Sequence, residues 1–162
     1  MSAHICRRRI AVTSLDILDA IKQRLLEKWP DRTIYMEVCP AEVNRPSFWL
    51  AVEKNEQTDA NRFMVRNDLQ IRLNIYDEAD EEHDVSWYRL AKETSDVMEH
   101  LSNVLLIGTR HLKLTLKALP RDPDRAHVQL NMSWLDSHTG TGAGTTVPAA
   151  DSYTLQIRDR KK

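Results

Sequence analysis

The sequence has few of the residues from which several common kinds of site are built. It contains two cysteines, Cys6 and Cys39, which are far apart and indicate neither a disulfide framework nor a zinc site. Its formal net charge of -1 lacks the basic excess of a dedicated nucleic-acid binder. No apolar run is long enough to cross a bilayer, and none of signal-peptide length follows the basic N-terminus. We therefore expect a protein that is made and kept in a cytoplasm.

Glycine is scarce as well, and three of the four glycines lie at Gly140, Gly142 and Gly144. A phosphate-binding loop would need Gly-Lys-Ser/Thr and a following helix, but Pro148 stands where that helix would begin. The segment is better interpreted as a flexible linker. The six histidines form no HExxH pattern, and Asp136-Ser137-His138 are neighbours in sequence, unlike the members of a catalytic triad. No enzyme, metal or cofactor site is predicted.

The remaining composition is that of an ordinary globular domain, with 41% hydrophobic and 29% charged residues. A length of 162 residues favours one domain with a real core. We expect a basic N-terminal arm at residues 1–13, a folded domain at 14–136, and a linker with a strand-like arm at 137–162.

Helical periodicity predicts two helices. Thr13 and Asp16 resemble a capping box at the start of the first helix, and Pro30 ends it. Its apolar face is expected to comprise Leu15, Ile17, Leu18, Ile21, Leu25, Leu26 and Trp29. The second helix is expected over residues 82–102, with an apolar side of Val85, Tyr88, Leu90, Ala91, Val97, Met98 and Leu101.

Alternating residues predict the strands. They are expected at residues 33–38, 47–53, 68–76, 112–117 and 128–134, with turns at 55–61 and 120–124 and the last two strands paired as an antiparallel hairpin. Pro46 suits the first residue of a strand, since it cannot donate to a sheet ladder. The fold class is therefore α+β, a mainly antiparallel sheet of about four to five strands packed against two helices, with extended terminal arms.

The acidic segment 77–84 allows more than one interpretation. It lacks the glycine and the alternating acids of a calcium-binding EF-hand loop. A solvated turn whose acids favour the positive end of the next helix is the simpler interpretation. The alternative is a surface for a basic partner, such as Arg7, Arg8 and Arg9 of a neighbouring subunit. Three tryptophans, Trp49, Trp87 and Trp134, are expected in the core or at a subunit interface.

The block Arg45-Pro46-Ser47-Phe48, the chain length and the order of elements resemble the tail-terminator proteins of tailed bacteriophages. Such proteins also occur in prophages and in phage-derived contractile particles. The resemblance covers roughly residues 15–136. It does not cover the first dozen residues or the terminal Gly/Thr-rich linker and strand-like segment.

The resemblance implies a structural virion protein. Its subunits would form a ring, usually a hexamer, that caps the head-proximal end of the tail tube and stops tube polymerisation. The neck and head would dock on this ring, and DNA would pass through its lumen without being read. The alternatives are a neck or head-completion connector and, in a different class, a small cytoplasmic enzyme or ligand-binding module.

Subunit and partner contacts are expected on a polar strand face, the acidic turn and both termini. The partners would be other copies of the chain, the tail tube protein, a neck protein and possibly a sheath subunit, with no membrane. Tyr153, Leu155 and Ile157 alternate in a segment too short to bury its apolar face alone, so it folds back or adds to a neighbour's sheet. The candidate contact residues are Arg7, Arg8, Arg9, Arg45, Gln70, Arg72, Asn74, Asp77, Glu78, Asp80, Glu81, Glu82, Tyr153, Leu155 and Ile157.

Overall fold

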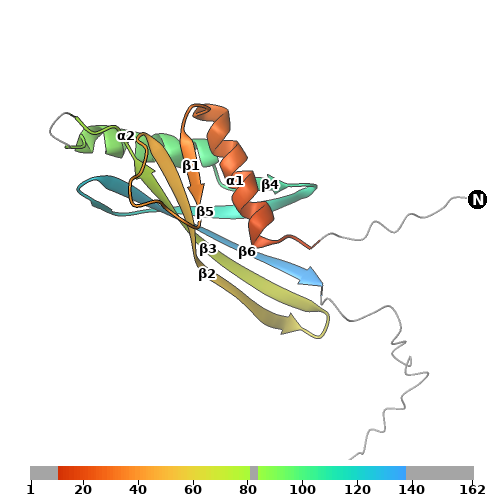
Figure 1. Ribbon diagram of the computed structural model, residues 1–162. Helices are drawn as coiled ribbons and strands as arrows, with labels where there is room; N and C mark the ends of the chain where they lie inside the picture. Colours follow the sequence, from red (N-terminus) through yellow and green to blue (C-terminus); the bar gives the residue numbers. More distant parts are fainter. Residues whose placement is uncertain (1–10, 81–83, 138–162) are drawn as a thin grey trace, which may run out of the picture.

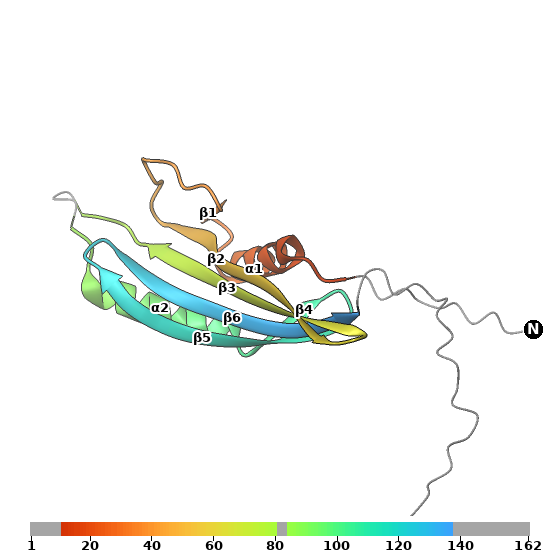
Figure 2. The ribbon, with the colours of Figure 1, turned by 90° about the horizontal axis from the view of Figure 1, so that it is seen from below.

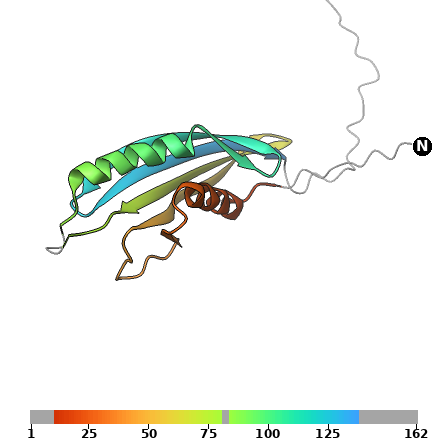
Figure 3. The same cartoon turned by 90° about the horizontal axis from the view of Figure 1, so that it is seen from above.

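The computed structural model describes residues 11–80 and 84–137. Two helices lie on one face of a curved sheet, and its other face is open (Figures 1 and 3). This arrangement confirms the predicted α+β class, with six strands in place of four to five. The expected terminal arms lie outside the described residues. In chain order, the elements are α1 (Ser14–Lys28), β1 (Thr33–Met36), β2 (Ser47–Asn61), β3 (Met64–Tyr76), α2 (Trp87–Leu101), β4 (Val104–Ile107), β5 (Arg110–Asp122) and β6 (Arg125–Ser137).

Helix α1 begins and ends where local chemistry predicts. The Thr13 side chain accepts from the backbone N–H of Asp16, and the Asp16 carboxylate accepts from the Thr13 N–H, which completes a capping box. The helix stops before Pro30. Most of the predicted apolar face is buried, but Leu15 is wrong, because it is 68% exposed. On the helix, Leu15 points away from the stripe formed by Ile17, Leu18, Ile21 and Leu25.

The six strands follow the order β1-β2-β3-β6-β5-β4. Strand β1 runs parallel to β2, and every other neighbouring pair is antiparallel. The predicted hairpin of the last two strands, β5 and β6, is confirmed. Strand β4 was not predicted, because Val-Leu-Leu-Ile is short and shows no polar alternation.

The interpretation of residues 55–61 as a turn is wrong. Strand β2 continues through them to Asn61 and pairs with β3 as far as Met64, with register shifts after Val52 and Asp59. The turn itself is Arg62-Phe63. From Glu53 onward every β2 residue is exposed, so neither side of this part of the strand needs apolar residues. That absence of alternation is why the sequence resembled a loop.

Other boundaries also differ from expectation, and strands β3 and β6 are both longer than predicted. Strand β5 runs through Pro120 to Asp122, so the turn is shorter than residues 120–124; Pro120 falls in a register shift, where it need not donate to a ladder. Strand β1 stops at Met36, two residues early. Helix α2 begins at Trp87 rather than residue 82, after Ser86 as its N-cap, and no acid lies in its first turn.

The hydrophobic core lies between the helices and the covered face of the sheet. Alternate residues of β3, Leu69, Ile71, Leu73 and Ile75, are buried there as predicted. Helix α2 contributes a narrow stripe of Leu90, Val97 and Leu101, so the prediction that Tyr88 and Ala91 belong to it is wrong. Both residues are exposed because they lie on sides of α2 that do not face the sheet.

The ends of the described chain share one end of the molecule. The start of α1 and the end of β6 lie near one another, and the start of α2 lies at the opposite end (Figures 1 and 2). Helices α1 and α2 run antiparallel, because Arg24 contacts His100 and Lys28 contacts Asp96. The protomer therefore has two chemically different ends.

Candidate contact surfaces

The open face of the sheet is polar and held together by its own side chains. Arg72 forms an ion pair with Glu53, and the Gln70 amide donates to the other oxygen of that carboxylate at 2.9 Å. Both residues were predicted to face a partner, and both lie on this face. Lys54 pairs with Glu56 at 2.9 Å farther along the β2 arm.

Asn74 also belongs to this face but is 2% exposed. Its amide donates to the Trp49 carbonyl at 3.3 Å, and its oxygen lies 2.7 Å from the Nδ1 atom of His127. The His127 Nε2 atom is 3.2 Å from Asp122, and this hydrogen bond is the main cause that lowers the pKa of Asp122. Asn74 thus ties three strands together, and its polar atoms are already engaged.

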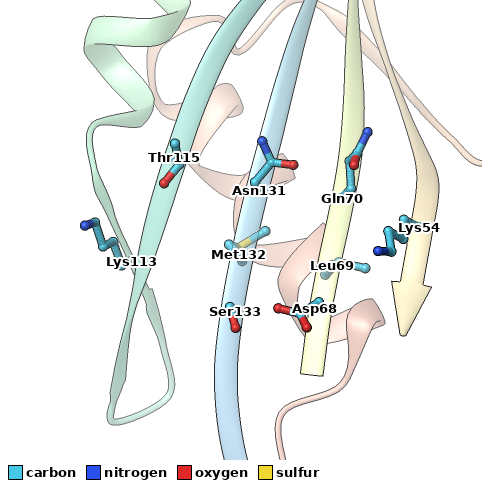
Figure 4. Close-up of a pocket in the computed structure, with 9 residues that line it drawn as sticks. All are labelled: Lys54, Asp68, Leu69, Gln70, Lys113, Thr115, Asn131, Met132 and Ser133. Atoms are coloured by element: carbon cyan, nitrogen blue, oxygen red, sulfur yellow. The ribbon is translucent and has the colours of Figure 1, made fainter. Parts of the chain in front are cut away.

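A shallow groove of about 380 Å³ crosses the same face. Figure 4 shows that its residues come from four neighbouring strands and include Lys54, Gln70, Lys113 and Asn131. Its lining has amide, hydroxyl and mixed charged groups, and it also includes Leu69 and Met132. An open surface of this kind suits a broad contact better than a small ligand, whose sites bury most of the ligand's surface.

Arg45 lies at a joint between segments distant in sequence. Its guanidinium donates to the Asp77 carbonyl at 3.2 Å and to both the carbonyl and carboxylate of Asp124 at 2.9 Å. It also lies over the ring of Tyr76, 5.3 Å from the centroid. The Arg45–Pro46 peptide bond, at the start of β2, is cis. Arg45 was predicted as a contact residue, and in the protomer it links β2 to the ends of β3 and β5.

The acidic segment after β3 is not uniformly exposed. Asp77 is 2% exposed; its carboxylate accepts from the backbone N–H of Glu78 at 2.8 Å and from Arg89 at 3.0 Å. Glu78 is exposed and lies 3.3 Å from the same guanidinium. Asp77 therefore anchors the segment to α2, and Glu78 presents its charge to solvent.

Asp80 and Asp84 form a closed backbone turn. The Asp80 N–H donates to the Asp84 carbonyl at 2.9 Å, and the Asp84 N–H donates to the Asp80 carboxylate at 2.8 Å. The predicted contact residues Glu81 and Glu82 lie outside the described residues. Helix α2 starts at Trp87, and no acid lies in its first turn.

An exposed aromatic pair begins α2. Trp87 and Tyr88 are 63% and 66% exposed, and their rings meet edge to face with centroids 6.0 Å apart. Of the three tryptophans noted, Trp134 is buried in the core and Trp49 is half-buried on the open face. Trp87 is the one with an interface-like exposure. The sequence could not show that Trp87 is exposed, because its exposure depends on where the first turn of α2 lies relative to the sheet.

The terminal candidates Arg7, Arg8, Arg9, Tyr153, Leu155 and Ile157 lie outside the described residues. Within residues 11–80 and 84–137, no group of three or more His, Cys, Asp or Glu side chains could hold a metal ion. None of the helices in that same part of the chain has the length and apolarity to span a membrane.

These features define a protein with an extensive polar sheet face and different contact surfaces at its two ends. A family model for phage tail terminator proteins matches residues 16–118, more than half of the chain. The match runs from the first turn of α1 into β5 and stops short of β6, whereas the resemblance was expected to extend to residue 136. No curated protein matches the sequence. The chain belongs to the phage tail terminator family, a family of structural proteins that associate with other components of the virion tail.

Proposed function

We propose that this protein forms a ring, with six subunits as the expected number, on the head-proximal end of a phage tail tube. The ring stops tube polymerisation and joins the tail to the neck and head. The family match carries this proposal. Assembly takes place in the host cytoplasm, and DNA passes through the lumen without sequence recognition.

The geometry of the protomer supports a ring. A ring requires a heterologous interface, in which two different surfaces of one subunit meet their counterparts on its neighbours. The start of α2 lies at one end of the molecule, and the start of α1 with the end of β6 lies at the other (Figure 1). Two unlike ends of this kind fit head-to-tail closure.

The predicted contact residues divide into two groups. Gln70 and Arg72 on the open sheet face, and Glu78 and Asp80 in the acidic segment, are proposed to contact neighbouring subunits or the tube, as are Glu81, Glu82 and the N-terminal arm. By contrast, Arg45, Asn74 and Asp77 make the bonds within the protomer described above. We assign these three to positioning the surfaces. We further propose that residues 14–136 are the folding unit, and that the arms at 1–13 and 137–162 serve assembly, the latter towards a neck or sheath protein.

The test is a tube polymerisation assay. Purified tail tube protein is polymerised with and without the full chain, and tube lengths and ends are measured by electron microscopy. The expected result is shorter tubes with an extra density at one end. Unchanged tube lengths, together with binding to isolated portal complexes, would overturn the proposal in favour of a connector.

A further inference from the structure

The aromatic pair at the start of α2 has the chemistry of a docking surface for cations. Trp87 and Tyr88 expose most of their surface, and Arg121 of the same chain already lies over the Trp87 ring at 5.5 Å from its centroid. Arginine stacks on aromatic faces and pairs with carboxylates through its planar fork. Large exposed aromatic rings are also the side chains most often found at the centre of protein interfaces.

Exposed acidic residues precede this pair in the chain. Glu78 and Asp84 are both exposed, and they precede Trp87 in the segment that leads into α2. Arg89 is shared between Asp77 and Glu78, so it offsets only part of this charge. The surface therefore combines aromatic rings with carboxylates, which together favour an arginine-rich partner.

We propose that this aromatic-acidic surface, comprising Glu78, Asp84, Trp87 and Tyr88, receives the N-terminal segment of a second copy of the chain. That segment, residues 1–10, reads MSAHICRRRI, with three adjacent arginines and no acid. The inference rests on the proposed ring and names one of its subunit contacts. Two observations favour this segment as the occupant: its charge is complementary to the surface, and it immediately precedes the described part of the chain.

The same subunit cannot supply all three arginines. In the antiparallel helix pair, thirteen residues separate His100 from the start of α2 and ten separate Arg24 from the start of α1. At about 1.5 Å per residue, and allowing for the tilt between the helices, the two starts are about 30 to 35 Å apart. Fully extended from Thr13, the Cα atom of Arg9 reaches about 14 Å and that of Arg7 about 21 Å. A neighbouring copy, placed head to tail, brings its arm to this surface directly.

Charge reversal in two separate full-length variants tests the contact. The first, R7E/R8E/R9E, retains the surface and loses the arm; the second, E78K/D84K, retains the arm and loses the surface. In low salt, each variant alone is expected to have the mass of a monomer by light scattering. An equimolar mixture is expected to recover the wild-type mass, because each arm then meets a surface of opposite charge on the other variant. Combining all five reversals in one chain is expected to restore that mass as well. R160E/K161E/K162E reverses three charges in the C-terminal arm, which is assigned to a neck or sheath protein and not to the contact between copies. It is the matched control, and its self-association in the absence of those proteins is expected to equal that of wild type.

A thiol cross-link gives an answer even when assembly is weak. Ala91 lies one helical turn from Trp87 and is exposed, so A91C in a C39S background places a thiol beside the surface. Oxidation is expected to join it to the native Cys6 of another copy and to give dimers and longer ladders on a non-reducing gel. The matched control A60C, at an exposed position in β2, is expected to give at least tenfold less product.

Either of two results overturns the inference: wild-type assembly by R7E/R8E/R9E, or equal cross-linking of the A91C and A60C chains. These results can be distinguished from a failure of the proposed function. If the proposed function is wrong, the wild-type protein will leave tube lengths unchanged. If wild-type protein shortens tubes and R7E/R8E/R9E does so equally well, the terminator role stands and this contact falls.

Discussion

A buried ion pair joins the loop after α1 to helix α2. Arg32 and Glu93 form this pair, with side-chain exposures of 14% and 9%. The Arg32 guanidinium also lies over the Phe48 ring, 4.8 Å from its centroid. Burial raises the pKa of Glu93, and the neighbouring Arg32 charge lowers it, with burial the larger effect.

Replacing Arg32 by Met leaves Glu93 buried without its partner. Breaking a buried pair in this way typically costs about 3 to 5 kcal/mol. The methionine keeps apolar contact with Phe48, and Glu93 can bind a proton, so we expect a cost of about 3 kcal/mol near neutral pH. The double variant R32M/E93M removes both charges and is expected to lie within about 1 kcal/mol of wild type.

The pH dependence has a definite sign. Because the pKa of Glu93 is raised on folding, the folded chain holds this proton more tightly than the unfolded chain does. The stability contributed by Glu93 is therefore complete below the ordinary glutamate pKa and is lost as pH rises through the raised value. Removing Arg32 takes away the charge that lowers this pKa, so the deficit of R32M should grow as pH rises from about 5 to about 7.5.

Urea unfolding followed by far-UV circular dichroism measures these free energies at both pH values. Lys54→Met is the matched control, because the Lys54–Glu56 pair is exposed and solvent-screened, so its loss is expected to change stability very little. The reasoning is refuted if R32M and K54M cost the same, or if the R32M deficit shrinks as pH rises.

Three further changes test the packing and the joints by the same unfolding assay. Ile17→Ala, at a fully buried position, should cost about 2 to 4 kcal/mol, whereas Leu15→Ala, two residues away and exposed, should cost less than about 0.5; equal costs would contradict the assignment of the α1 face. Thr13→Ala should cost about 1 kcal/mol, with Thr13→Ser close to wild type, since only the hydroxyl is needed for the cap. Arg45→Met should cost about 2 kcal/mol by removing charged hydrogen bonds to Asp124, and a cost no larger than that of Lys54→Met would show that this joint contributes little.

Sequence patterns predicted those elements whose two sides face different surroundings. Strand β3 alternates because one side packs under the helices while the other lies on the open face. Helix α1 shows both its cap and its buried stripe because it lies flat on the sheet. In these places local pattern and tertiary environment agree, so periodicity was a sufficient guide.

The patterns failed where both sides of an element meet the same surroundings. The outer half of β2 is exposed on both faces and therefore shows no alternation. Strand β4 was missed for another reason: Val104 and Leu106 are exposed although apolar, so the sequence does not show that its two sides differ. The start predicted for α2 was too early: Asp84 is hydrogen-bonded to Asp80, and the helix begins only at Trp87.

The contact surfaces were only partly visible in the sequence. Charge density located the acidic segment, but it could not show that Asp77 is buried against Arg89 while Glu78 faces solvent. Likewise, nothing in the local pattern separates Arg45, which is engaged by Asp124, from an arginine available to a partner. Such distinctions depend on residues far away in sequence, here separated by about eighty positions for Arg45 and Asp124.

The asymmetry of the protomer restricts the assemblies that it can form. An isologous dimer centred on the aromatic-acidic surface would oppose like charges. A head-to-tail contact brings the acidic end of one copy to the basic arm of the next and leaves an unused arm and an unused surface on every open chain. Closure into a ring satisfies both at once, so short open oligomers should be scarce relative to monomers and closed rings. Sedimentation velocity across a concentration series measures that distribution, and a dimer that accumulates as the main species of wild-type protein would argue against head-to-tail closure.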